Sequence, residues 1–267
     1  MPSITVSADV DLQYTDVGSG QPIVFVHGGH MSKAVWRHQE ASLAPEYRVI
    51  AVDLRGHGES DKPYCDYSIE TFADDLAALV DGLDLNDPVV VGWSVGAQVV
   101  AEYLGRDPDA VDGVVFVSSV LFDRIAPDVE AEIDVDGLVS RQQTNQPAAM
   151  LSFVSDSLSD GVGEPTRRWL WRVAMGTPVY VGVNHLRSLE SLSYERIADS
   201  LQDVTVPALV VHGALDDVTS DAGASHFATE VLGSGRAVTF DDSAHFSFIE
   251  ESARFTETLV DFLESDR

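Results

Sequence analysis

The chain has 267 residues, 45% of them hydrophobic, and it carries 44 acidic residues against 16 basic ones. The hydrophobic share is enough for the core of one large domain, so the net charge of -28 does not by itself indicate a disordered chain. A single cysteine, Cys65, excludes an internal disulfide framework. The excess of acids argues against nucleic-acid partners, because such a surface repels phosphates.

The acids are spread along the chain rather than gathered in a tail, and the only lysines are Lys33 and Lys62. Mutual repulsion destabilises a compact state unless salt screens it, and the Debye length shrinks to about 3 Å at 1 M salt. The composition resembles that of proteins from halophilic archaea, which implies a salt-rich cytoplasm. The alternative is an ordinary acidic mesophilic protein.

The first residues show no basic segment followed by an apolar stretch, the pattern of a secretory leader. No run approaches the roughly 18 apolar residues that a membrane-spanning helix requires. The sequence therefore predicts a cytoplasmic protein without a membrane partner. It does not indicate an oligomeric state.

Residues 4–6 and 12–15 alternate between apolar and polar side chains, which predicts an N-terminal antiparallel pair of strands. Beyond the turn at 18–22 come short, continuous apolar runs, which are typical of strands buried on both faces of a parallel sheet. These runs lie at residues 23–26, 49–52, 89–91, 114–117, 208–211 and 237–240.

Helical patterns lie between the predicted strands. Residues 69–83 carry an apolar stripe of period 3.6, with Ser68 as a plausible N-cap, and residues 95–104 and 246–263 are also predicted to be helical. The alternation of strands and helices indicates an α/β fold with right-handed crossovers.

The alternation breaks between residues 122 and 201, a region rich in Asp, Ser and Gln that includes amphipathic pieces at 166–175 and 183–192. A structureless loop of that length is improbable inside a compact domain. We therefore expect residues 122–201 to form an inserted helical cap on a core made of residues 1–121 and 202–267.

The motif with the most specific chemistry is Gly92-Trp93-Ser94-Val95-Gly96, which follows one predicted strand and opens a helix. This G-x-S-x-G pattern in a strand–turn–helix setting is the signature of a nucleophile elbow, in which the serine hydroxyl projects from a sharp turn. A Gly-Ser turn without chemistry is the competing interpretation of the motif alone.

A serine nucleophile needs a histidine base, and the base needs a carboxylate to fix its tautomer. His245 follows the last predicted strand, and Asp216 follows the strand before it. Loops at the carboxyl ends of strands are where the sites of open α/β sheets assemble. We predict a triad of Ser94, Asp216 and His245, with Asp217 as the rival for the acid.

An oxyanion hole needs two backbone N–H groups. We assign one to Val95, directly after the nucleophile, and the other to Gly29 in the loop that follows the strand at 23–26, with His30 as the alternative. His27 in the same loop is expected to brace it rather than to transfer protons.

Taken together, these motifs resemble the α/β-hydrolase superfamily, and specifically its cap-bearing serine-hydrolase branch. The resemblance implies an eight-stranded, mostly parallel sheet with an antiparallel second strand, helices on both faces and a helical cap after strand six. It also implies the triad named above. The matching segments are His27-Gly28-Gly29, residues 53–60, Gly92-Trp93-Ser94-Val95-Gly96, residues 212–216 and Ala244-His245-Phe246.

Related dehalogenases and epoxide hydrolases carry aspartate where this chain has Ser94, so the resemblance favours acyl transfer. We expect a serine hydrolase that cleaves a small carboxylic ester or a related thioester, lactone or amide. The alternatives are an acyltransferase, a C–C bond hydrolase, and a non-catalytic ligand-binding protein on the same fold.

No cofactor or metal motif is present, because the chain has no P-loop and no metal-ligand spacing. The expected partner is a small acyl substrate in a mostly apolar pocket. Candidate residues for substrate binding are His30, Trp36, Trp93, Phe122, Trp169 and Phe246. Trp169 and Trp171 cannot share a helix face, so we expect at most one of them in the pocket.

The salt hypothesis has a direct test. Thermal unfolding should occur at a clearly higher temperature in molar KCl than in dilute buffer, because screening relieves the repulsion among the acids. Circular dichroism melts at the two salt concentrations measure this difference. Equal melting temperatures would instead identify an ordinary acidic protein.

Overall fold

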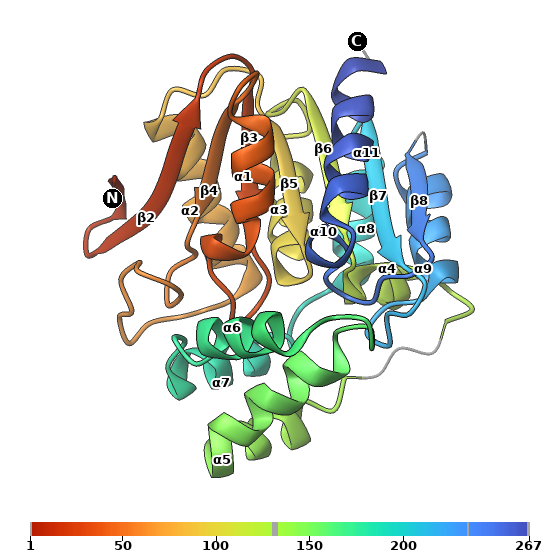
Figure 1. Cartoon of the computed structure of the whole chain (residues 1–267). Coiled ribbons are helices and arrows are strands. Elements are labelled where there is room, and N and C mark those ends of the chain that lie inside the picture. The colour runs from red at the N-terminus through yellow and green to blue at the C-terminus, as the bar shows by residue number, and fades with distance from the viewer. Residues whose placement is uncertain (1, 130–132, 234, 266–267) are drawn as a thin grey trace.

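The computed structural model describes residues 2–129, 133–233 and 235–265, and its centre is one sheet in the order β1-β2-β4-β3-β5-β6-β7-β8 (Figure 1). β2 runs antiparallel to β1 and to β4, and all other neighbouring strands are parallel. The predicted sheet, including its antiparallel second strand, is confirmed. The strands are β1 (Ser3–Ser7), β2 (Val10–Gly18), β3 (Pro22–Val26), β4 (Arg48–Val52), β5 (Val89–Trp93), β6 (Gly113–Val117), β7 (Ala208–Gly213) and β8 (Arg236–Phe240).

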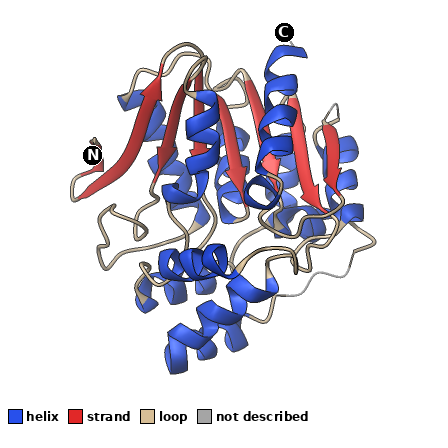
Figure 2. Cartoon of the chain, viewed as in Figure 1, coloured by secondary structure: helices blue, strands red, loops and turns tan. Residues whose placement is uncertain are grey.

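Helices cover both faces of the sheet (Figure 2). α1 packs against α11 on one face, and α2, α3 and α8 pack together on the other. These flanking elements are η1 (Lys33–Trp36), α1 (Arg37–Leu43), α2 (Ile69–Gly82), α3 (Val95–Arg106), α4 (Val120–Ile125), α8 (Tyr194–Leu201), α9 (Asp221–His226), η2 (Phe227–Val231), α10 (Ser247–Glu250) and α11 (Ser252–Ser265).

The continuous apolar runs are explained by two cores, one on each side of the sheet. In β3, Ile23 and Phe25 belong to the cluster beneath α1 and α11, whereas Val24 and Val26 belong to the cluster beneath α2 and α3. Successive side chains of a strand point to opposite faces, so a strand covered on both faces has to be apolar at every position.

The predicted start of the helix after Ser68 is confirmed, whereas the helix predicted near the end of the chain is interrupted. Ser68 caps α2 as predicted, because its side chain accepts a hydrogen bond from the backbone N–H of Thr71. The continuous helix predicted for 246–263 is wrong: Glu251, at φ -119° and ψ 51°, separates α10 from α11. The carboxylates of Glu250 and Glu251 turn back to accept hydrogen bonds from the loop before α10, which stabilises the break.

Three helices lie across the edge of the sheet where the parallel strands end, drawn in green below the strands in Figure 1. They are α5 (Val135–Asp156), which kinks at Asn145, α6 (Glu164–Ala174) and α7 (Val179–Ser188). Within the expected cap segment, α4 and α8 do not cross this edge, because α8 packs against α3 and α4 beside the sheet. The amphipathic patterns at 166–175 and 183–192 correspond to α6 and α7, the latter beginning directly after Pro178.

Hydrogen bonds tie the crossing helices to the core on two sides. On one side, the Asn184 side chain accepts from the backbone N–H of Tyr67 at 3.0 Å, and the Tyr180 hydroxyl donates to the carbonyl of Lys62 at 2.5 Å. On the other side, the backbone N–H of His245 donates to the carbonyl of Ser157 at 3.1 Å. The end of α5 is therefore bonded directly to the loop that carries the predicted catalytic histidine.

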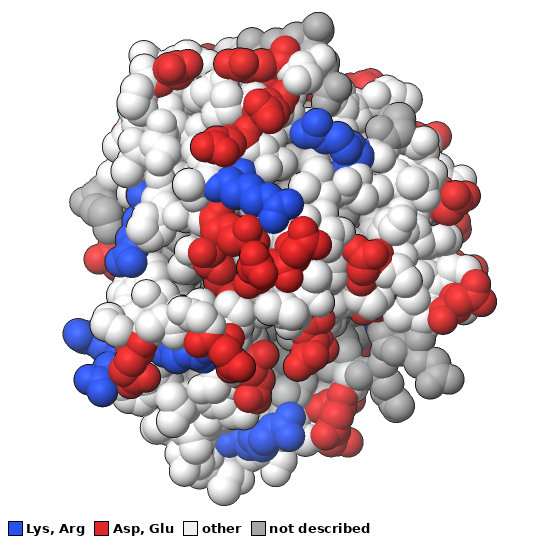
Figure 3. Space-filling model, turned by 45° about the vertical axis from the view of Figure 1, so that its right-hand side comes forward, with Lys and Arg blue, Asp and Glu red and all other residues white. Residues whose placement is uncertain are grey.

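Among the charged side chains on the face drawn in Figure 3, acidic groups are scattered over much of the surface and outnumber the basic ones. Across the described ranges, no helix has both the length and the apolar character that a bilayer crossing demands.

Buried histidines support the contact between α7 and the core. His185 of α7 is only 4% exposed, and its Nδ1 lies 3.1 Å from the carbonyl of Tyr67, so the ring is neutral with its proton on Nδ1. Burial lowers the pKa of His185 to about 4, with a smaller opposing effect from the Tyr67 carbonyl. His27 and His57 are buried close by and His30 is partly buried, and burial lowers the pKa of each of them.

The burial of His185 predicts that the folded protein loses stability as the pH falls. The unfolded chain takes up a proton on His185 near pH 6.5, whereas the folded chain does so only near pH 4, so stability is lost as the pH falls through that interval. The loss for His185 alone is on the order of 3 kcal/mol. In urea titrations between pH 7 and pH 4, His185→Gln should therefore flatten the slope of stability against pH. The comparison variant His38→Gln, at an exposed position where the pKa is lowered only slightly by partial burial and by Arg37, should flatten the slope much less, and a wild-type slope in His185→Gln would contradict the assignment.

Candidate active site

The backbone makes a sharp turn at Ser94, between the end of β5 and the start of α3. Ser94 has φ 55° and ψ -116°, a left-handed conformation that costs energy for a residue with a side chain. A Cβ on Gly92 would lie 2.5 Å from the carbonyl oxygen of Gly96, and one on Gly96 would lie 2.3 Å from that of Val26. Both glycines of the motif are therefore required by close packing of backbone on backbone.

Neighbouring strands hold this turn in place. The backbone N–H of Ser94 donates to the carbonyl of Val117 in β6 at 2.9 Å, and the Ser119 hydroxyl donates to the carbonyl of Ser94 at 2.9 Å. Ser94 itself stays partly exposed at the N-terminus of a 12-residue helix. The helix dipole therefore favours negative charge next to its hydroxyl.

The loop after β3 approaches the same turn. A Cβ on Gly28 would lie 2.9 Å from Cβ of Ser94, and one on Gly29 would lie 3.1 Å from a methyl group of Val95. The structure thus brings the loop of Gly29 against Ser94 and Val95, the two residues with which we expected it to act.

His27 holds that loop to the end of β4. Its Nδ1 donates to the carbonyl of Gly28 at 2.7 Å, and its Nε2 accepts from the backbone N–H of Leu54 at 3.1 Å. A neutral imidazole satisfies both contacts, and burial, as the largest effect, lowers the pKa of His27. This arrangement matches the bracing role expected for His27.

Asp216 and His245 meet at the carboxyl ends of β7 and β8. Nδ1 of His245 lies 2.9 Å from Oδ2 of Asp216, and the two residues are 1% and 9% exposed. The backbone N–H of Val218 donates to the other carboxylate oxygen at 2.8 Å. Burial by itself would raise the pKa of Asp216, but the nearby imidazole, the Val218 N–H and the Thr219 hydroxyl outweigh burial and lower it. A buried, ionised carboxylate therefore orients the His245 ring.

The choice between the two neighbouring acids is decided by this contact. Asp216 is buried against the imidazole, whereas Asp217 is exposed. Of the two acids, Asp216 is the one that contacts and orients His245.

Ser94 and His245 lie on adjoining parts of the site. The Trp93 ring, next to Ser94 in the chain, lies 5.3 Å from the His245 ring between centroids, and its indole N–H donates to the His245 carbonyl at 2.9 Å. Within the described ranges, no hydrogen bond joins the Ser94 hydroxyl to the imidazole. In enzymes with a serine nucleophile, this contact often tightens only when substrate binds.

Aromatic rings from the core and the crossing helices gather beside this site. The His30 ring lies 6.4 Å from the Phe153 ring of α5, and Phe153 lies 6.4 Å from Phe246. Phe246 in turn contacts Trp93 at 4.5 Å between centroids. Of the six candidates for substrate binding, His30, Trp93 and Phe246 therefore lie in this aromatic cluster.

The other three candidates lie elsewhere, and two of them require correction. Trp36 is fully buried against Phe248, with ring centroids 4.2 Å apart, and Phe122 is fully buried against Phe227 at 4.9 Å. Both rings fill the hydrophobic core, where burying their large apolar area stabilises the fold. Among the described residues, neither ring contacts a member of the aromatic cluster formed by His30, Trp93, Phe153 and Phe246.

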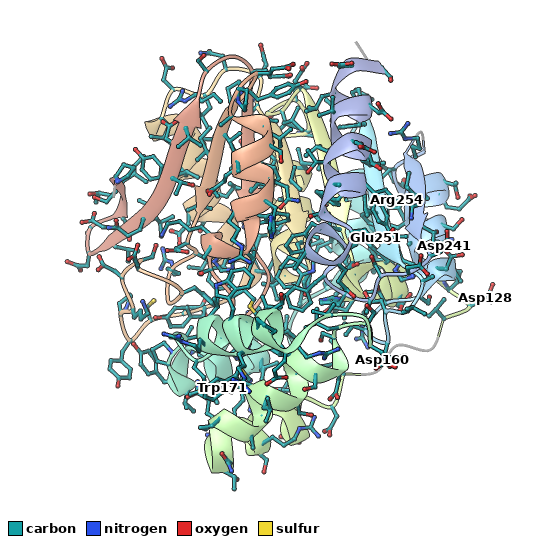
Figure 4. The ribbon with its side chains drawn as sticks, viewed as in Figure 1. Asp128, Asp160, Trp171, Asp241, Glu251 and Arg254 are labelled. Carbon is teal, nitrogen blue, oxygen red and sulfur yellow. The ribbon has the colours of Figure 1, made fainter. Side chains whose placement is uncertain are left out.

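The two tryptophans of α6 also contact other parts of the molecule. The guanidinium of Arg37 lies 3.8 Å from the centre of the Trp169 ring, which joins α6 to α1. The Trp171 indole N–H donates to the carbonyl of Pro147 at 3.0 Å, which joins this ring to α5; Trp171 is labelled in Figure 4.

Sequence reasoning missed Phe153 and Gln142, both on α5. Gln142 is 4% exposed, and its Oε1 and the Nε2 of His30 would each lie 2.4 Å from a Cβ placed on Gly182. The part of α5 that carries Gln142 is polar in sequence, so no periodic signal marked it as facing the core. Only the placement of the helix over the sheet edge brings Gln142 to His30.

A sequence model of the alpha/beta hydrolase fold matches residues 21–252. The chain belongs to this family. A non-heme chloroperoxidase from Streptomyces lividans is 31% identical, with 99% of this chain and 100% of the relative covered. An esterase from Exiguobacterium antarcticum superposes with a TM-score of 0.89 at 26% identity, covering 99% of this chain and all of that one. An esterase from a Rhodococcus species superposes with a TM-score of 0.83 at 25% identity, covering 100% and 99% of the two chains.

The different environments of the two acids predict different effects of substitution. Asp216→Asn should lower kcat by about 10⁴-fold, because the amide favours the wrong imidazole tautomer. Asp217→Asn is the matched control and should keep wild-type kcat. Steady-state kinetics on an activated acyl ester measures both variants, and the reverse pattern would contradict the assignment of Asp216.

Proposed function

We propose that this protein is a serine hydrolase that cleaves a small carboxylic ester, or a related thioester, lactone or amide, through an acyl-enzyme on Ser94. The observation that carries the proposal is the buried hydrogen bond between Asp216 and His245, set beside a serine held in a strained strand–turn–helix bend. Esterases of closely similar fold support the same class of reaction.

In the first half of the proposed cycle, the Ser94 oxygen attacks the carbonyl carbon of the substrate while Nε2 of His245 accepts the hydroxyl proton. Asp216 keeps the other ring nitrogen protonated and stabilises the imidazolium that forms. The carbonyl oxygen becomes an oxyanion, which the backbone N–H groups of Gly29 and Val95 stabilise.

In the second half, the imidazolium gives its proton to the leaving group as the bond to the acyl carbon breaks. Water, activated by the neutral His245, then attacks the acyl-enzyme and restores the Ser94 hydroxyl. The substrate, water and these side chains therefore supply every atom and proton that the cycle transfers.

The surroundings of Ser94 favour a compact acyl group. Gly28 and Gly29 press against Ser94 and Val95 from one side, and Phe153 and Phe246 belong to the aromatic cluster beside the site. Hydrophobic and aromatic walls with a few polar groups are typical of pockets for small organic ligands. A short aliphatic or aromatic ester fits these walls better than a charged substrate does.

The nucleophile can be tested by removing its hydroxyl. Ser94→Ala should fold normally and lower turnover of p-nitrophenyl butyrate by about 10⁴-fold or more, because the triad members act as a unit. A fluorophosphonate probe should label the wild-type protein at Ser94. Ser225→Ala, at an exposed position of α9, is the matched control and should keep both turnover and labelling.

Two outcomes would overturn the proposed function. A folded wild-type protein that the fluorophosphonate does not label would point to a binding protein on this fold. Retained turnover in Ser94→Ala would place the nucleophile elsewhere.

Because one relative is a chloroperoxidase, bromide oxidation by hydrogen peroxide should be assayed in parallel with ester hydrolysis.

A further inference from the structure

A chain of hydrogen bonds continues from the triad acid away from Ser94. The Thr219 hydroxyl donates to Oδ2 of Asp216 at 2.8 Å, the same oxygen that faces Nδ1 of His245. Nδ1 of His212 lies 3.1 Å from the Thr219 oxygen. His212 and Thr219 are 2% and 3% exposed, so all four side chains of this chain are buried.

The direction of each bond follows from counting protons. An ionised carboxylate only accepts, so the single Thr219 proton goes to Asp216, and His212 must donate its Nδ1 proton to the Thr219 oxygen. Burial, as the largest effect, lowers the pKa of His212, which keeps its ring neutral near pH 7. The bonds therefore all point toward Asp216, and each polarises the next.

We propose that Thr219 and His212 are positioning residues that set the basicity of His245 through Asp216. This inference rests on the proposed function, because it concerns the base of that reaction. A hydroxyl donor on Oδ2 withdraws negative charge from the oxygen that stabilises the imidazolium. The donor thereby keeps the imidazole less basic than it would be beside a carboxylate without it.

The chain of His212, Thr219 and Asp216, called the relay below, borders an open surface depression of about 810 Å³. Acidic residues from several elements also line this depression. Asp241, one of them, is labelled near the end of β8 in Figure 4. The charged and titratable groups around Asp216 and His245 are His212 on β7, Asp123 on α4, Asp217 in the loop after β7, Asp221 at the start of α9, Asp241 after β8, Glu250 and Glu251 at the end of α10, and Arg254 of α11, which pairs with Glu251. All of them remain in place in the variants described next, apart from His212 where it is itself replaced.

Thr219→Val removes the hydroxyl at nearly constant volume, while the Val218 N–H continues to hold the other oxygen of Asp216. The acid limb of the kcat/KM profile should move to higher pH by roughly half a unit to one unit, the size expected for one hydrogen bond to a charged group. Thr219→Ser keeps the donor and should restore the wild-type profile. Thr229→Val, at an exposed position, is the matched control and should leave the profile unchanged.

His212 has its own pair of variants. His212→Leu should move the acid limb in the same direction by a smaller amount, and His212→Asn, whose amide can donate from the position of Nδ1, should restore it. In the double variant with Thr219→Val, the shift should equal that of Thr219→Val alone, because His212 acts through Thr219. A merely structural role would lower the melting temperature without moving the profile. His212→Leu leaves the 216–219 loop intact and keeps the test available if Thr219→Val does not fold.

The pH titration of the His245 ring, followed by NMR without substrate and assigned with His245→Gln, separates this inference from the proposed function. We expect the titration midpoint to rise in Thr219→Val and in His212→Leu. Unchanged midpoints in both variants, or additive shifts in the double variant, would overturn the relay even in an active hydrolase. An inactive wild-type protein would overturn the proposed function, and with it the relay as part of that reaction.

Discussion

The strained backbone turn at Ser94 is the constraint on which the other features of the site depend. Its positive φ is maintained because β5, β6 and α3 fix the backbone on both sides, and because Gly92 and Gly96 leave no side chain in the way. The same close packing brings the Gly28–Gly29 loop against the serine. A single geometric requirement thus determines where Ser94, the proposed nucleophile, projects and where the proposed oxyanion donors lie.

Asp216 and His245, the proposed acid and base, are held in place by a shell of hydrogen bonds around the two loops that carry them. Asp216 is bonded to Val218 and Thr219 within its own loop, while the backbone on either side of His245 is bonded to Glu250. A buried carboxylate is stable only with such donors, because burial alone disfavours its charge. The contacts that ionise Asp216 are therefore the same contacts that orient His245.

The crossing helices connect this site to the rest of the molecule. α5 brings Phe153 into the aromatic cluster and is bonded through Ser157 to the backbone of His245, while α7 is fixed to the 62–67 loop by Tyr180, Asn184 and His185. The crossing helices are thus bonded directly to the loop of the proposed base.

The sequence by itself determined the sheet, the elbow at Ser94 and the positions of Asp216 and His245 after their strands. These features leave local signals: continuous apolar runs for strands covered on both faces, glycines at fixed spacing, and chain order. It did not determine which aromatic residues face the site, because burial in the core and burial in a pocket select the same side chains, as Trp36 and Phe122 show. Phe153, Gln142, Thr219 and His212 were placed only by tertiary structure, since their roles arise from contacts between distant segments that no periodicity records.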